Sequence, residues 1–69
     1  MELEGEIIEI IYKNELNSYC IAVMQTLTDD EITIVGYLPF INVGDTIKVV
    51  GKMVEHQEYG EQFKVDTFE

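Results

Sequence analysis

Residues 44–65 read GDTIKVVGKMVEHQEYGEQFKV, and they alternate apolar with polar side chains on both sides of a Tyr-Gly pair. Such alternation is typical of strands that bury one face, because successive side chains of a strand point to opposite sides. Gly60 is expected to supply the positive φ of a bulged turn between the two strands. The segment therefore predicts a β-hairpin, around which the rest of the fold must be built.

The hairpin pattern assigns each side chain to one of two faces. The inward residues are expected to be Ile47, Val49, Gly51, Met53, Phe63 and Val65. The outward residues are expected to be Lys48, Val50, Lys52, Val54, Gln62, Lys64 and Asp66. Three of the four lysines therefore point outward from this hairpin, although the whole chain carries a formal net charge of -10.

Three more strands are expected before the hairpin. They are Gly5–Lys13, Tyr19–Thr26 and Ile32–Leu38, separated by the turn clusters NELNS and LTDDE. The inward phase of the first strand changes between Ile7 and Ile8, so we expect a bulge there and a strand that serves two sheets. Gly36 indicates a bend or a close backbone approach in the third strand. Pro39 closes that strand, and a turn at Gly44 leads into the hairpin.

These strands predict a small all-β fold. Five strands, a bent first strand and a glycine-kinked fourth favour an OB-fold barrel, in which closure removes the sheet edges. An SH3-like barrel is the alternative. A chain of 69 residues buries only roughly 60% of its unfolded surface. We therefore expect a single compact domain over residues 1–69, without a large catalytic cleft.

The charge of the chain restricts its partners. Fourteen acidic residues stand against four lysines, and there is no arginine. This balance repels phosphates and argues against strong, autonomous DNA or RNA binding, unless one face is locally basic or the chain is the N-terminal piece of a longer protein. The start of the chain lacks the pattern of a signal peptide, and Cys20 is its single cysteine. A cytoplasmic, reducing setting is expected.

Four stretches could be mistaken for catalytic or metal-binding motifs. GDTIKVVGKM has six residues between its glycines and Met53 after the lysine, whereas a P-loop needs four residues there and a Ser or Thr after its lysine. His56 is expected to hydrogen-bond its own turn, because a zinc site needs more ligands than the chain offers. Residues 29–31 (DDE) are interpreted as a solvated turn. Cys20, in the middle of a strand with no basic neighbour, is expected to be packed or half-packed. We therefore predict no catalytic residue, no metal site and no cofactor in this domain.

Nucleic-acid binding is the function that these residues could support. OB-folds bind single strands across their second and third strands and the flanking loops, with bases stacked on aromatic side chains and phosphates held by cations. The candidate stacking residues are Tyr19, Tyr37 and Tyr59, and the candidate phosphate-binding residues are Lys13, Lys48, Lys52 and Lys64. Packing at a barrel end would equally explain the tyrosines. Edge protection and charge balance would equally explain the lysines.

The turn residues resemble those of one protein family. The shared features are Gly36-Tyr37-Leu38-Pro39, Gly44-Asp45, Gly51, His56, Tyr59-Gly60, residues 62–65 (QFKV), and in the opening segment Tyr12, Asn14, Asn17 and Tyr19. Together they resemble the N-terminal OB-fold domain of bacterial RecD-like ATP-dependent DNA helicases, which are similar to the exodeoxyribonuclease V alpha subunit. The family tends to carry basic residues around its Tyr-Gly pair, whereas this chain has Glu58 and Glu61.

The resemblance implies a parent protein that unwinds DNA in repair and recombination, with ATP and magnesium bound by motor domains beyond Glu69. The 69 residues would then be a non-catalytic module that positions single-stranded DNA or packs on the motor domains. Two alternatives remain open: an acidic adaptor that docks a partner protein without binding DNA, and a free-standing nucleic-acid-binding OB protein. A locally positive face on the second and third strands would favour DNA, and an exposed apolar patch would favour docking.

Overall fold

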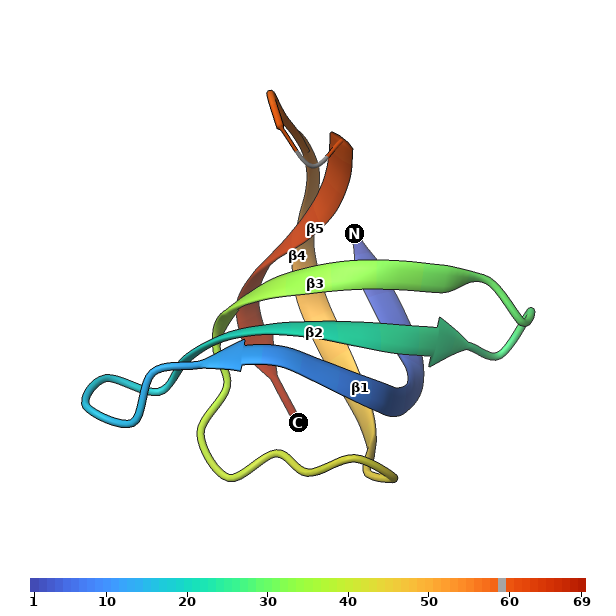
Figure 1. Ribbon diagram of the computed structural model, residues 1–69. Helices are drawn as coiled ribbons and strands as arrows, with labels where there is room; N and C mark the ends of the chain where they lie inside the picture. Colours follow the sequence, from blue (N-terminus) through green and yellow to red (C-terminus); the bar gives the residue numbers. More distant parts are fainter. Residues whose placement is uncertain (59) are drawn as a thin grey trace.

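The computed structural model describes residues 1–58 and 60–69. Its five strands are β1 (Glu2–Lys13), β2 (Tyr19–Thr26), β3 (Glu31–Tyr37), β4 (Thr46–His56) and β5 (Gly60–Phe68). They close into a barrel in the order β1-β2-β3-β5-β4, with β3 and β5 parallel and the other neighbours antiparallel (Figure 1). The predicted five-stranded OB-fold is confirmed.

Two bulges bend β1 so that it serves two parts of the barrel. Its first half pairs with β4 and its second half with β2. Ile7 is opposite Met24 while Glu9 is opposite Val23, so Ile8 is an extra residue, as the phase change predicted. A second extra residue, Ile11, was not predicted. Because each bulge shifts the alternation by one residue, β1 turns a different set of side chains outward after each of them.

The core fills the barrel from all five strands and from the loop after β3. Its buried apolar residues are Ile7, Cys20, Ala22, Met24, Ile34, Leu38, Ile41, Ile47, Val49, Phe63 and Val65. The inward phase of β4 ends earlier than predicted, because Met53 is 37% exposed. The β4–β5 hairpin projects from the barrel (Figure 1). Met53 lies closer to the end of β4 in this hairpin than Val49, which is fully buried.

Gly51 lies where the backbones of β4 and β5 approach each other closely. The pairing of β4 with β5 shifts register between Val50 and Gly51. A Cβ atom at position 51 would collide with the carbonyl oxygen of Lys64. A glycine is therefore required for the two backbones to approach this closely, as the predicted kink implied. At the other end of the hairpin Gly60 has a φ of 78°, which confirms the positive φ predicted for this residue.

Hydrogen bonds hold the two loops at one end of β2 and β3. Leu38, which the sequence placed in the third strand, follows the end of β3 and donates its N–H to the carbonyl oxygen of Ser18 at 3.0 Å. The expected turn before β4 is present, because the Asn42 N–H donates to Asp45 Oδ2 at 2.8 Å. Within the described residues, no helix has the length and apolar character needed to cross a membrane.

Candidate nucleic-acid interface

The outer face of β2 and β3 is built from paired apolar and aromatic side chains. Cys20, Ala22 and Met24 of β2 face the core, so the alternate residues of that strand face outward. The register joins these outward residues to β3 as Tyr19 with Tyr37, Ile21 with Val35 and Val23 with Thr33. The outer side of the barrel thus carries mainly apolar side chains at this point, of which Ile21 and Val23 are partly exposed and Val35 is buried.

Tyr19 and Tyr37, two of the predicted stacking residues, are brought together at one end of this face. Their ring centroids are 5.4 Å apart with an interplanar angle of 73°, an edge-to-face pair. Tyr37 is 63% exposed, whereas Tyr19 is half-buried. The Tyr19 N–H donates to Asn17 Oδ1 at 3.0 Å, and the Tyr19 carbonyl accepts from the Asn14 N–H at 2.8 Å. The backbone of Tyr19 is therefore held in place, and its ring packs against that of Tyr37, which is the more exposed of the two.

A row of side chains crosses the outer face from β1 to β4. Register pairs join each residue to the next, in the order Tyr12, Ile21, Val35, Lys64 and Lys52. The row begins with an aromatic ring, continues over two aliphatic side chains and ends in two lysines. Adjacent strands lie about 4.8 Å apart, so the row spans roughly 19 Å. The accessible apolar area therefore lies at the end of the row formed by Tyr12 and Ile21, because Val35 is only 6% exposed, and the positive charge lies at the other end.

The structure separates Lys48 from the other two lysines that were predicted to point outward from the hairpin. Lys52 and Lys64 lie directly opposite each other on β4 and β5. Lys48 is four residues from Lys52 along β4, about 13 Å for an extended strand, and it lies opposite Glu4 of β1. Lys13 lies at the end of β1 near the tyrosine pair, opposite Cys20. Positive charge on this face is therefore concentrated at the pair formed by Lys52 and Lys64.

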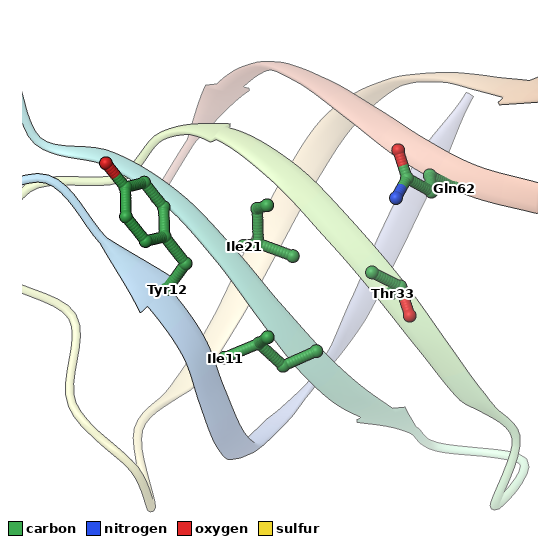
Figure 2. Close-up of a pocket in the computed structure, with 5 residues that line it drawn as sticks. All are labelled: Ile11, Tyr12, Ile21, Thr33 and Gln62. Carbon is green, nitrogen blue, oxygen red and sulfur yellow. The ribbon is translucent and has the colours of Figure 1, made fainter. Parts of the chain in front are cut away.

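A hollow of about 470 Å³ lies on the same face, and the sequence analysis did not identify it. It is lined by Ile11, Tyr12, Ile21, Thr33 and Gln62, which come from β1, β2, β3 and β5 (Figure 2). Gln62 was expected to point outward into solvent, but it is only 8% exposed. It does lie on the outer face, and that face is hollowed beside it. Two adjacent bulky residues at a bulge, Ile11 and Tyr12, are the signal that could have indicated this hollow.

The tip of the β4–β5 hairpin is acidic. Glu55 and Glu61 lie opposite each other in the register of the two strands. His56 accepts a hydrogen bond from the Glu58 N–H at Nδ1, with a distance of 3.1 Å, so its predicted role within its own turn is confirmed. Tyr59, the third predicted stacking residue, lies outside the described residues.

Cys20 is a packed core residue, but the expectation that it has no basic neighbour was wrong. Lys13 lies opposite it on β1. Burial raises the pKa of the Cys20 thiol, and the Lys13 charge opposes this shift only in part. The thiol is therefore protonated at neutral pH. Over residues 1–58 and 60–69, no group of three or more His, Cys, Asp or Glu side chains is placed to hold a metal ion.

Comparison with known families gives one match. A family model described as "ATP-dependent DNA helicase YrrC, OB-fold domain" matches residues 1–69. No solved structure matches the chain. The match covers the five strands and both loops that flank the outer face of β2 and β3.

Proposed function

Because this chain belongs to the OB-fold domain family of the ATP-dependent DNA helicase YrrC, we propose that it positions single-stranded DNA for a helicase motor. The match confirms the resemblance to the OB-fold domain of a RecD-like helicase, and it makes residues 1–69 a non-catalytic accessory module. ATP hydrolysis and strand separation, together with ATP and magnesium binding, then belong to motor domains outside this chain.

The outer face of β2 and β3 carries the proposal, because it combines the exposed Tyr37 with the row that ends in Lys64 and Lys52. Bases of a single strand are unpaired, so their faces are available to stack on an exposed ring such as Tyr37. Tyr37 is two residues along β3 from Val35, which lies opposite Lys64, so Lys64 and its partner Lys52 are the cations placed to meet the phosphates. In duplex DNA the base faces are stacked on one another and must be unstacked before a side chain can reach them, so this combination favours a single strand.

The acidic body of the domain supports a positioning role over tight binding. The formal net charge of -10 repels the phosphate backbone at long range. Attraction is confined to the few lysines that lie on or beside the outer face. The module therefore guides a strand that the motor already holds, and by itself it binds weakly.

Fluorescence anisotropy of labelled oligo-dT, measured between 50 and 150 mM salt, tests this function. If Lys52 and Lys64 each neutralise one phosphate, affinity falls about fivefold over that range, because each contact contributes about 0.7 to the logarithmic salt slope of a single strand. Tyr37→Ala weakens binding about tenfold, since one stacked base contributes about 1–3 kcal/mol. Leu27→Ala, at the opposite end of β2, is the matched control and leaves affinity unchanged. Absence of binding at 50 mM salt would refute autonomous DNA recognition.

A second candidate function, docking of a protein partner, is favoured by two exposed residues outside the lysine-bearing strands. Leu16 in the β1–β2 loop is 97% exposed, and Phe40 in the β3–β4 loop is 90% exposed. These loops, residues 14–18 and 38–45, contain two carboxylates and no lysine, so they suit an apolar protein surface with a basic rim and do not suit phosphates. The motor domains of a helicase have such cationic surfaces because they bind DNA.

Docking is tested with purified motor domains of a family helicase that lack the OB-fold domain. The Leu16→Ser, Phe40→Ser double variant loses binding to the motor domains in a titration calorimetry experiment but retains the affinity of the wild type for oligo-dT. Equal binding of both proteins to the motor domains rules out these loops as the docking surface.

A further inference from the structure

We infer that the hollow lined by Gln62 holds one nucleobase of the bound strand and that the Gln62 side-chain amide hydrogen-bonds the edge of that base. This inference rests on the proposed function, and it assigns a second site on the outer face beyond the tyrosine pair and the lysines. With this site, the outer face contacts the edge of a base in addition to the phosphate backbone of the bound strand.

Gln62 has the properties of a ligand-binding residue. Its side chain is more than nine-tenths buried, yet it lies at the wall of an open hollow and is directed towards it (Figure 2). Among the described residues, no hydrogen bond to this amide is made. Among the described residues every buried side-chain nitrogen or oxygen has a hydrogen-bond partner. The amide atoms of Gln62 therefore reach the solvent in the hollow, where their donors and acceptor are available for a ligand.

The neighbours of Gln62 match the chemistry of a base. Thr33 of β3 lines the hollow beside it and adds a hydroxyl group that both donates and accepts. Ile21 forms the floor between Thr33 and β1, and Tyr12 forms the opposite wall (Figure 2). A base is a flat, largely apolar ring with polar groups along its edge. It therefore fits with its face over Ile21 and its edge at Gln62 and Thr33.

The phosphate of the same strand has a partner close by. Lys64 is two residues from Gln62 on β5, and both residues lie on the outer face, so their Cα atoms are about 7 Å apart. Lys52 lies directly opposite Lys64. A strand that places one base in the hollow therefore carries its backbone past the lysine pair.

The amide of glutamine complements thymine well. Its carbonyl oxygen accepts from the thymine N3–H while its NH₂ group donates to a thymine carbonyl. Because an amide pairs in a similar way with other bases after rotation, the inference concerns contact with a base edge and does not require strict thymine specificity.

The test measures the contribution of bases separately from that of phosphates. Anisotropy compares dT15 with a 15-nucleotide abasic strand of the same charge, for the wild type, Gln62→Leu and Gln25→Leu. Leucine approximates the size of glutamine without the amide, and Gln25 is the matched control because it lies on the outer phase of β2, away from the hollow. We expect Gln62→Leu to weaken dT15 binding about tenfold, to leave abasic binding unchanged and so to reduce the ratio between them. Gln25→Leu is expected to keep the ratio of the wild type.

A second measurement does not depend on the folding of a variant. In the ¹⁵N-labelled wild-type protein, the side-chain amide signals of Gln62 are expected to shift on addition of thymidine monophosphate, and those of Gln25 are expected to stay in place. Binding of dT15 by the wild type with an unchanged ratio in Gln62→Leu, or with unmoved Gln62 signals, overturns the base site and leaves the proposed function intact. Failure of the wild type to bind dT15 at all overturns the proposed function and the base site with it.

Discussion

The ring of Tyr19 packs edge to face against the ring of Tyr37, with centroids 5.4 Å apart, across the antiparallel pair of β2 and β3. Their sequence separation is spanned by two strands and a turn, so only strand pairing brings the rings together. Tyr19 is fixed by backbone hydrogen bonds on both sides of the ring position, while Tyr37 remains the more exposed partner. Tyr19 thus supports the pair, and Tyr37 is the ring that is accessible to a ligand.

The two tyrosines should be coupled energetically. In a double-mutant cycle with Tyr19→Ala and Tyr37→Ala, we expect a coupling of about 0.5–1.5 kcal/mol in the free energy of unfolding, as for other aromatic pairs. Urea unfolding followed by circular dichroism measures it. The control cycle pairs Tyr37 with Leu27, at the opposite end of β2, and should be additive. A coupling near zero between Tyr19 and Tyr37 would contradict the supporting role.

The lysine pair is expected to lower stability while it favours DNA binding. Like charges directly opposite each other on neighbouring strands destabilise a sheet, so Lys52→Gln should raise the free energy of unfolding by about 0.2–1 kcal/mol. The same change should reduce the salt slope of oligo-dT binding by about 0.7. Lys48→Gln is the matched control. Because Lys48 lies opposite Glu4, its loss should bring no gain in stability.

Gly51 should tolerate no side chain. Gly51→Ala places a methyl group against the Lys64 carbonyl and forces β4 and β5 apart, which should cost about 1–3 kcal/mol in the free energy of unfolding. Gly60→Asn is the comparison, since asparagine accepts the left-handed conformation that Gly60 adopts at the hairpin turn. If both variants unfold at the urea concentration of the wild type, the close approach at Gly51 does not constrain the fold.

Cys20 should be unreactive in the native state. Burial raises its pKa, so the thiolate is scarce at neutral pH, and the sulfur is also inaccessible. Ellman's reagent should label it at the rate of global unfolding, and rapidly in 8 M urea. The unfolded thiol has a pKa of about 8.5, so it ionises at a lower pH than the folded thiol does. The contribution of Cys20 to the free energy of unfolding is therefore full below the unfolded pKa and is lost as the pH rises towards the folded pKa. Fast labelling of the native protein at pH 7 would contradict the burial of this side chain.

Local patterns account for much of this fold. Alternation identified all five strands, the phase change at Ile7 and Ile8 identified the first bulge, and Gly60 identified the hairpin turn. These features depend on the alternation of apolar and polar side chains and on local backbone conformation, and both are set by residues that are neighbours in the sequence. The second bulge at Ile11 was missed, because the pattern IIYK is compatible with either phase.

The surface that matters for the proposed function was decided by tertiary structure. Gln62 has the local pattern of an outward, solvated residue, but it is buried in a hollow whose other lining residues come from β1, β2 and β3. The sequence placed Lys48, Lys52 and Lys64 on one side of a hairpin, but only strand register set Lys52 opposite Lys64 and Lys48 opposite Glu4. Periodicity by itself thus determined the strands and their turns. Pairing between strands distant in sequence determined which side chains share a site, because no local pattern encodes register across a closed barrel.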